Sequence, residues 1–263
     1  MMSKTENNLK IDGFNKTHIN WTDLTWNPWT GCSKVSAGCK FCYIDNIEIQ
    51  QGKDPKVVKR TSKWTFEKPL KVPTPSIFFT CSMSDFFHPA ADEWRKEAWE
   101  IIRRTPHHRY QILTKRPERI RECLPDDWCQ ANYKHVWLGT SVENNDPKVI
   151  DRIRILREVP CEIRFISFEP LLDDVKLEKS QLEGIHWGII GGESGKYVKG
   201  KPQFREADPQ WFRNLRDILK DAGVLVWFKQ AGTYLAHKYK MKGKGDALYQ
   251  IPSDLRLRER PEF

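Results

Sequence analysis

Six short apolar runs recur along this chain at nearly regular intervals. They are Ile77–Cys81, Tyr110–Thr114, Val136–Thr140, Ile163–Ser167, Trp187–Gly191 and Val224–Phe228. Successive runs begin 24 to 37 residues apart, which leaves room for one helix in each interval. Because most runs are continuous rather than alternating, they predict strands that are buried on both faces of a parallel sheet and joined by right-handed crossovers.

The segments between the runs carry the signals of helices. Residues 92–104 place apolar side chains on one helical face. The pairs Asp146-Pro147 and Asp208-Pro209 each have the form of an N-cap followed by proline at the first helical position. Strands and helices are therefore predicted to alternate through most of the chain.

The number of strand–helix units separates two α/β architectures. An earlier strand is expected near Ile19–Trp26, which gives six or seven units in 263 residues. This number favours a partial or complete (β/α) barrel of about six or seven parallel strands over a doubly wound sheet. No low-complexity segment or linker divides the chain, so we expect a single domain over residues 1–263, with a basic C-terminal tail or lid from about residue 233.

Composition excludes several classes of protein. With 39% hydrophobic and 30% charged residues, the chain is typical of a globular protein rather than a disordered one. No apolar run approaches the ~20 residues of a membrane helix, so no membrane partner is expected. The first eight residues lack the apolar core of a signal peptide, which indicates a cytoplasmic protein.

The net charge of +9 is concentrated in two segments. Residues 53–71 carry a net charge of +5, residues 229–245 carry another +5, and the remainder sums to −1. Aromatic residues interleave with both segments, at Trp64, Phe66, Tyr234 and Tyr239. Lysines bind phosphates and aromatic rings stack on bases, so a nucleic acid or nucleotide is a candidate partner, although lysine runs are also common as solvated surfaces.

Three of the seven cysteines lie within eleven residues, as Cys32, Cys39 and Cys42, with the spacing C-x6-C-x2-C. In a reducing compartment such a group indicates a metal or cluster site rather than disulfides. Three thiolates are one fewer than a structural zinc or a fully ligated iron–sulfur cluster normally uses. Two interpretations follow: a cluster with one open iron, or a zinc ion whose fourth ligand comes from elsewhere, with Cys81, His18 and His186 as candidates.

Polar residues follow all six apolar runs. The carboxyl ends of the strands carry the chemistry in (β/α) barrels, so these positions are candidate site residues. Glu169, Glu193 and Lys229 are the candidate catalytic residues, which would contact the substrate, and Lys115, Arg116 and Lys229 could bind an anion. The other candidates at these ends are Ser82, Ser84, Asp85, Ser141, Glu143 and Asn144.

The cysteine segment resembles a known signature. Residues 39–42, Cys-Lys-Phe-Cys, resemble the second half of the radical S-adenosylmethionine (SAM) motif C-x3-C-x-aromatic-C, with Phe41 in the aromatic position. The first spacing departs from that motif, because six residues separate Cys32 and Cys39 instead of three. The wider pattern over residues 27–43 resembles an uncharacterised, often phage-encoded family, and this resemblance extends to residues 138–144 and 191–194.

The resemblance to the radical SAM superfamily implies an enzyme. Cys32, Cys39 and Cys42 would bind a [4Fe–4S] cluster, whose open iron would chelate SAM. Reduction by an external electron donor, such as a flavodoxin or ferredoxin, would cleave SAM to a 5′-deoxyadenosyl radical that abstracts hydrogen from the substrate. The resemblance also implies SAM-binding roles, by strand order, for Phe41, Ser82, Ser84, Asp85, Ser141, Glu143 and Asn144.

A rival interpretation comes from a different class of function. The chain could be a non-catalytic nucleic-acid-binding protein stabilised by zinc or by a cluster. Such a protein would have no SAM site, and changing the acids at the strand ends would leave its affinity unaltered. If the cysteine loop and the strand ends face the same side, both basic segments could surround one active-site mouth.

Overall fold

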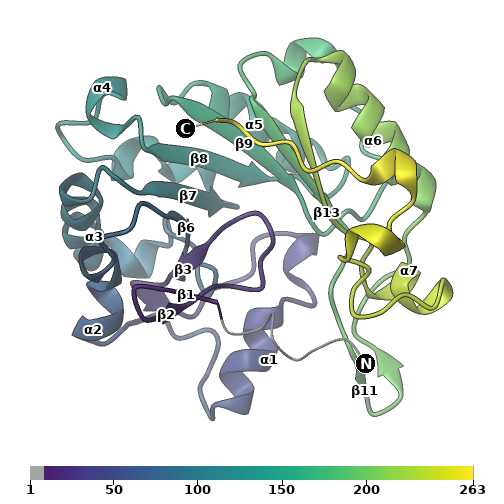
Figure 1. The fold of residues 1–263 in the computed structure, drawn as a ribbon, viewed down its shortest axis with the longest axis horizontal. Helices are drawn as coiled ribbons and strands as arrows, with labels where there is room; N and C mark the ends of the chain where they lie inside the picture. The colour runs from purple at the N-terminus through teal and green to yellow at the C-terminus, as the bar shows by residue number, and fades with distance from the viewer. Residues whose placement is uncertain (1–8, 263) are drawn as a thin grey trace.

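The computed structural model describes residues 9–262, and its central element is a parallel sheet (Figure 1). The residues from which the absence of a signal peptide was inferred, Met1 to Asn8, lie outside the described residues. The strands of the sheet are β3 (Leu24–Trp26), β6 (Ile77–Thr80), β7 (Arg109–Thr114), β8 (Val136–Ser141), β9 (Ile163–Phe168), β10 (Trp187–Gly191) and β13 (Leu225–Gln230). All six predicted runs, and the earlier strand expected near Trp26, are confirmed as members of this sheet.

The order of the strands in the sheet is β3-β6-β7-β8-β9-β10-β13, which is also their order in the chain, and every neighbouring pair is parallel. A doubly wound sheet reverses direction at a switch point, and no reversal occurs among the described strands. The sheet curls as a half-barrel, so the predicted α/β fold with a partial (β/α) barrel is confirmed.

The helices follow the sequence signals closely. Helix α3 (Asp92–Arg104) has the bounds that were predicted. Helices α5 (Pro147–Arg157) and α6 (Pro209–Asp221) begin at the two prolines, directly after their aspartate caps. The Asp146 carboxylate accepts from the Lys148 amide at 2.9 Å, and the Asp208 carboxylate accepts from the Gln210 amide at 2.8 Å.

Short elements complete the chain. The remaining strands are β1 (Lys10–Ile11), β2 (Phe14–Asn15), β4 (Trp29–Thr30), β5 (Lys59–Arg60), β11 (Tyr197–Val198) and β12 (Lys201–Pro202). The remaining α-helices are α1 (Tyr43–Gln50), α2 (Lys63–Phe66), α4 (Gln130–Tyr133) and α7 (Thr233–Lys238). The 3-10 turns are η2 (Ala37–Cys39), η3 (Lys68–Lys71), η4 (Pro89–Ala91), η5 (Pro117–Arg119), η6 (Arg121–Cys123), η7 (Lys179–Leu182), η8 (Leu248–Gln250) and η9 (Ser253–Leu255). No helix within residues 9–262 has the length and apolar character needed to cross a membrane.

The two faces of the sheet pack against different partners. Helices α3, α5 and α6 cover the outer face and share the larger apolar core with it. The inner face carries a second cluster, made of Trp21, Phe79, Trp137, Phe165, Trp187, Ile189 and Trp227. Because Trp21 comes from the segment before β3, the N-terminal part of the chain fills the inside of the half-barrel.

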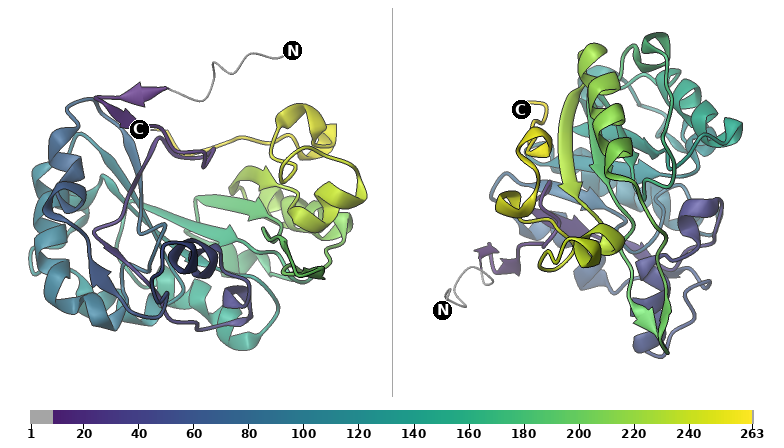
Figure 2. Two further views of the ribbon diagram at one scale, coloured as in Figure 1. Left: turned by 90° about the horizontal axis from the view of Figure 1, so that it is seen from below. Right: turned by 90° about the vertical axis from the view of Figure 1, so that its right-hand side faces the viewer.

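The C-terminal segment covers the last strand of the sheet. The Phe228 amide donates to the Leu257 carbonyl at 2.9 Å, and the Glu259 amide donates to the Val226 carbonyl at 3.0 Å. The indole of Trp187 also donates to the Glu259 carbonyl at 2.8 Å. Figure 2 shows this yellow segment and the purple N-terminal segment on the same side of the sheet, away from α6. Residues 257–259 therefore cover the free edge of β13, which protects this strand from pairing with another molecule.

Candidate metal centre at the strand ends

The cysteine loop, residues 31–42, lies at the carboxyl end of the sheet between β4 and α1. Cys39 ends the turn η2, and Cys42 directly precedes α1. Cys32, Cys39 and Cys42 are free thiols and are partly exposed. The loop is therefore open to a ligand at the end of the barrel where the strand-end residues were predicted to gather.

The start of the loop is bound to the segment that follows β6. The Gly31 amide donates to the Met83 carbonyl at 3.0 Å, and the Ser84 hydroxyl donates to the Gly31 carbonyl at 2.5 Å. Gly31 has a φ of +86°, and a Cβ there would lie 2.3 Å from the Val57 carbonyl oxygen. Only glycine fits this position, which accounts for the Gly-Cys pair that opens the loop.

Asn27 strengthens the same junction. Its side-chain oxygen accepts from the Met83 amide at 2.9 Å, and its side-chain nitrogen donates to the Ser82 hydroxyl at 3.1 Å. The Tyr43 hydroxyl donates to the Ser82 carbonyl. The end of β6 is thus fixed from both sides of the cysteine loop, and the predicted residues Ser82 and Ser84 contact the loop and its flanks.

Arg116, just after the end of β7, holds the part of the loop that contains the first cysteine. Its guanidinium donates to the Asp85 carboxylate at 3.0 Å, to the Ser33 carbonyl at 2.9 Å and to the Ser33 hydroxyl at 2.8 Å. It also lies 3.8 Å from the Cys32 sulfur. Nε2 of His88 lies 2.9 Å from the Ser33 hydroxyl oxygen. Burial and the nearby Asp85 charge raise the pKa of Cys32 to about 11, although Arg116 acts in the opposite direction.

Glu143, beyond the end of β8, holds the middle of the loop. Its carboxylate accepts from the Ser36 hydroxyl and, at 3.3 Å, from the Gly38 amide. Arg152 of α5 lies 3.1 Å away and Lys115 lies 3.9 Å away. Glu143 is fully buried, and burial by itself raises its pKa, but Lys115, Ser36 and Arg152 together bring the pKa below its usual value. A charged carboxylate at this point binds the cysteine loop to the sheet.

A second carboxylate stands at the end of β9. The Lys229 ammonium lies 2.7 Å from both oxygens of Glu169. The Gln230 side chain donates to Glu169 at 3.1 Å and to the Ser194 hydroxyl at 2.6 Å. Two of the three predicted substrate residues, Glu169 and Lys229, therefore form one ion pair across the ends of β9 and β13.

The third predicted substrate residue, Glu193, forms an ion pair with Arg205. The Arg205 guanidinium carbon lies 5.6 Å from the centre of the Phe41 ring, and the Lys40 ammonium lies 5.1 Å from the same centre. Two cations therefore lie within cation–π distance of the aromatic residue of the cysteine motif. The end of β10 thus meets the cysteine loop through Arg205.

Two predicted residues lie between the end of β8 and α5. The Ser141 carbonyl accepts from Arg152 at 2.9 Å, and the Asn144 side chain accepts from the Asp146 amide at 3.2 Å. Asn144 therefore shapes the turn that leads into the helix. Its assignment to SAM remains a prediction, as does that of Ser141.

Four contact residues were not among the predicted site residues. Asn27 could have been found, because it opens the Asn-Pro-Trp-Thr-Gly-Cys pattern. Arg152, His88 and Arg205 lie in ordinary helix or loop sequence and reach the site only through the fold. Their polar atoms face the cysteine loop or its anchors, so they belong to the site.

The thiols provide a suitable donor set without a preformed metal cage. Within residues 9–262, no three His, Cys, Asp or Glu side chains are arranged to hold a metal ion. Negative charge at Cys39 nevertheless raises the pKa of both Cys32 and Cys42, although burial is the larger cause for each. Cys32 and Cys42 therefore both lie near enough to Cys39 for its charge to act on them, and sulfur donors suit zinc or an iron–sulfur cluster.

The three candidates for a fourth zinc ligand lie in different parts of the fold. His186 lies at the amino end of β10, where its Nδ1 accepts from the Arg164 amide at 3.1 Å. His18 precedes β3 and is exposed. Cys81 directly follows β6, has a φ of +62° and is buried. Burial, together with negative charge at Asp85 and Cys32, raises its pKa well above the usual value. Cys81 is thus the candidate that lies near the loop.

The first basic segment is largely used within the fold. Arg60 pairs with Glu97 at 2.7 Å, and Lys68 donates to the Thr25 carbonyl at 2.8 Å. The part nearest the site is its beginning, where the Pro55 carbonyl accepts from the Cys32 amide at 2.8 Å. Residues 53–59 therefore lie next to the cysteine loop, whereas the charges at residues 60 and 68 serve internal contacts.

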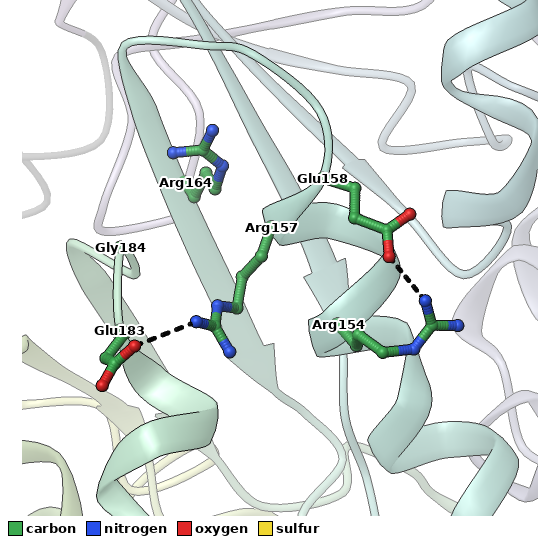
Figure 3. Close-up of a pocket in the computed structure, with 6 residues that line it drawn as sticks. All are labelled: Arg154, Arg157, Glu158, Arg164, Glu183 and Gly184. Atoms are coloured by element: carbon green, nitrogen blue, oxygen red, sulfur yellow. Dashed lines mark hydrogen bonds and ion pairs between the residues drawn. The ribbon is translucent and has the colours of Figure 1, made fainter.

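A pocket at the other end of the sheet carries three arginines and two glutamates (Figure 3). It is lined by Arg154, Arg157, Glu158, Arg164, Glu183 and Gly184. Arg154 pairs with Glu158 at 2.6 Å and Arg157 pairs with Glu183 at 3.3 Å, as the dashed lines in Figure 3 show. Because it lies beside the amino end of β9, this pocket is separate from the cysteine loop.

Comparison with known proteins identifies a family for the chain but no function. No curated protein and no solved structure matches it. The model of the family described as "Protein of unknown function (DUF5131)" matches residues 16–251, which is most of the chain. The chain therefore belongs to the DUF5131 family.

Proposed function

We propose that this protein is a radical SAM enzyme that binds a [4Fe–4S] cluster through Cys32, Cys39 and Cys42. The observation that carries the proposal is the position of three free thiols in one loop at the carboxyl end of a partial (β/α) barrel. Side chains from three successive strand ends, those of β6, β7 and β8, hold or flank this loop. This is the end of the barrel at which enzymes of this architecture carry their chemistry.

The donor set fits a cluster with one open iron better than it fits a structural zinc. Zinc in structural sites takes four protein ligands, and the loop supplies three sulfur atoms. A [4Fe–4S] cluster held by three cysteines leaves one iron free for SAM. When bound, the reduced cluster would supply the electron that cleaves SAM and so generates the radical that takes hydrogen from the substrate.

The residues of the chain have distinct roles in this proposal. Glu143 and Arg116 position the loop, because they bind its backbone and its serines. Phe41 forms one wall of the SAM site, next to Arg205. Glu169 and Lys229 present a carboxylate and an ammonium group to the polar atoms of SAM or substrate. Direct SAM contacts by Ser82, Ser84, Asp85, Ser141, Glu143 and Asn144 form part of the same proposal.

The setting of the proposed enzyme follows from its chemistry. Free thiols and a reducible cluster require a reducing compartment, so we place the protein in the cytoplasm. An external one-electron donor, of the flavodoxin or ferredoxin class, is needed to reduce the cluster.

Metal analysis after anaerobic reconstitution tests the proposal. The wild-type protein should contain about four irons, and Cys39→Ala should lose them because three thiolates are the minimum for the cluster. Cys129→Ala is the matched control, since Cys129 is an exposed thiol outside the loop. One zinc per chain with no iron would contradict the proposal.

The position of Cys81 favours one alternative, a zinc-stabilised nucleic-acid-binding protein. Cys81 lies near Cys32 and could complete a set of four sulfur ligands. Cys81→Ser separates the two functions. A zinc site would lose its metal in this variant, whereas the proposed cluster keeps all three of its ligands and its iron.

A further inference from the structure

A short hairpin projects from the sheet beside α7 (Figure 1). Strands β11 and β12 pair Tyr197 with Pro202 and Val198 with Lys201. All residues from 196 to 202 are exposed. The hairpin is not part of the apolar core, so its side chains are available to a partner.

The base of the hairpin is fixed to the mouth of the barrel. The Gly195 amide donates to the Thr233 hydroxyl at 2.9 Å, and the Thr233 amide donates to the Glu193 carbonyl at 2.9 Å. Arg205, three residues after the hairpin, links Glu193 to Phe41 of the cysteine loop. A partner bound to the hairpin would therefore lie next to the candidate metal centre.

The hairpin and the residues around α7 form one basic surface, which we name the lysine surface. It consists of exposed lysines, namely Lys196, Lys199, Lys201, Lys238, Lys240 and Lys242. Residues 194–205 and 233–245 contain no acidic residue. Among residues 9–262, no hydrogen bond or ion pair engages any of these six ammonium groups, in contrast to Arg60 and Lys68 of the first basic segment.

Aromatic rings stand among these lysines. The Tyr197 ring stacks on His237 of α7, with 5.5 Å between centroids and 17° between planes. This contact holds the hairpin against α7, yet Tyr197 is still 53% exposed. Tyr239 is 52% exposed, and the Lys238 ammonium lies 5.9 Å from its ring centre. The surface therefore offers both cations and accessible aromatic faces.

We propose that the lysine surface binds single-stranded nucleic acid and delivers it to the strand ends. Unpaired lysines neutralise backbone phosphates, and exposed tyrosines stack on bases that a duplex would keep paired. Only the assumption that the bound strand is then chemically altered depends on the proposed SAM chemistry. Binding itself depends on the hairpin and α7, and it is measured without SAM or reductant.

Fluorescence anisotropy with a labelled 20-nucleotide strand tests the proposal on the full chain. The wild-type protein should bind the single strand more tightly than the corresponding duplex, and affinity should fall steeply with salt. The triple variant Lys199→Gln, Lys201→Gln, Lys242→Gln should reduce the slope of log K against log salt by about 2, since each phosphate contact contributes about 0.7. The matched control neutralises Lys96, Lys134 and Lys148, three exposed lysines on other elements, and should leave the slope unchanged.

Substitutions of Tyr197 provide a second test of the proposal, one that does not depend on charge. Tyr197→Ala should weaken binding roughly tenfold with the salt slope unchanged, and Tyr197→Phe should restore the affinity, because stacking needs the ring and not the hydroxyl. Equal loss in the control triple variant, equally tight binding of duplex, or equally tight binding of anionic phospholipid vesicles would overturn the proposal. A protein that binds the strand but does not cleave SAM would leave this inference standing and reject the proposed enzyme.

Discussion

Glu143 is a buried carboxylate that faces cations on one side and the cysteine loop on the other. Its oxygens contact Ser36 and Gly38 of the loop, and Arg152 and Lys115 balance its charge. A Cβ at Gly38 would lie 3.0 Å from the Glu143 carboxyl group, so the loop backbone approaches it closely. This one side chain couples the loop to β7, β8 and α5.

Replacing Glu143 by glutamine should therefore loosen the loop. Glutamine keeps the shape but leaves Arg152 and Lys115 without their counter-charge, so the free energy of unfolding should fall by about 3 kcal/mol. Urea denaturation checks the stability, and the rate at which Cys39 and Cys42 react with a thiol reagent checks the loop. Glu118→Gln, at an exposed position, is the control. Unchanged stability and thiol reactivity in Glu143→Gln would show that Glu143 does not hold the loop.

Arg116 acts through geometry as well as charge. Its planar guanidinium reaches Asp85 and both oxygens of Ser33 at once, which an ammonium group cannot do. Arg116→Lys should therefore expose Cys32, with a thiol reaction rate about tenfold higher, equivalent to about 1.4 kcal/mol of lost restraint. Arg121→Lys, at a position where the guanidinium donates to the Glu158 carbonyl away from the cysteine loop, is the comparison. Equal rates in the two variants would contradict this role.

At the residue scale, the sequence predicted which residues lie at the strand ends better than it predicted which residues they contact. Glu143, Asp85 and Arg116 were found because they follow apolar runs, and strand ends converge in a parallel sheet. Their partners in the cysteine loop could not be found, because hydrogen bonds such as that from Gly38 to Glu143 join residues about a hundred positions apart. Local sequence carries no record of such pairs.

Among the elements, the junction between η3 and β7 contains a titratable group inside the core. His108 is fully buried; the Ser76 amide donates to its Nδ1 at 3.2 Å, and its Nε2 lies 3.1 Å from the Pro69 carbonyl oxygen. Burial lowers the pKa of His108 from 6.5 to about 4. The folded protein therefore keeps this imidazole neutral under conditions in which the unfolded chain binds a proton.

The sign of the pH dependence follows from this difference. Between pH 6.5 and pH 4 the unfolded state binds more protons, so the contribution of His108 to stability is fully present above pH 6.5 and is lost as the pH falls toward 4. Between pH 7.5 and pH 5.5 the loss should be about 1.4 kcal/mol. Urea denaturation at the two pH values measures it, and His108→Gln should remove that part of the difference while His135, also buried, and the half-buried His186 still contribute. An identical pH dependence in wild type and variant would be inconsistent with this assignment.

The elements that the sequence predicted are those with local signals. Continuous apolar runs marked the strands of the sheet, and two Asp-Pro pairs marked the starts of α5 and α6. The pairing of residues 257–259 with β13 has no such signal, because it depends on where the chain returns after α7. The β11–β12 hairpin had only a weak local signal in the sequence. Lys199 and Gly200 both adopt positive φ in its turn, and a Lys-Gly pair is a poor indicator of such a turn.

For the whole molecule, the regular spacing of strands predicted the barrel order but not its closure. Closure depends on whether β3 and β13 meet, and the described part of the chain instead places Trp21 on the inner face of the sheet and residues 257–259 along the free edge of β13. The two basic segments of the sequence, residues 53–71 and 229–245, had a similar limit. They identified the lysines near α7 but not the hairpin beside them. They also included Arg60 and Lys68, which pair within the fold.

The most direct test of the central claim is 5′-deoxyadenosine formation by the reconstituted protein. Under anaerobic conditions with SAM and dithionite, chromatography should detect 5′-deoxyadenosine from the wild type and from Cys129→Ala. Cys42→Ser, which removes one of the three thiolates of the loop, should give none. Product formation at the wild-type rate by Cys42→Ser, or no product from iron-loaded wild type, would contradict the assignment of the cysteine loop to radical SAM chemistry.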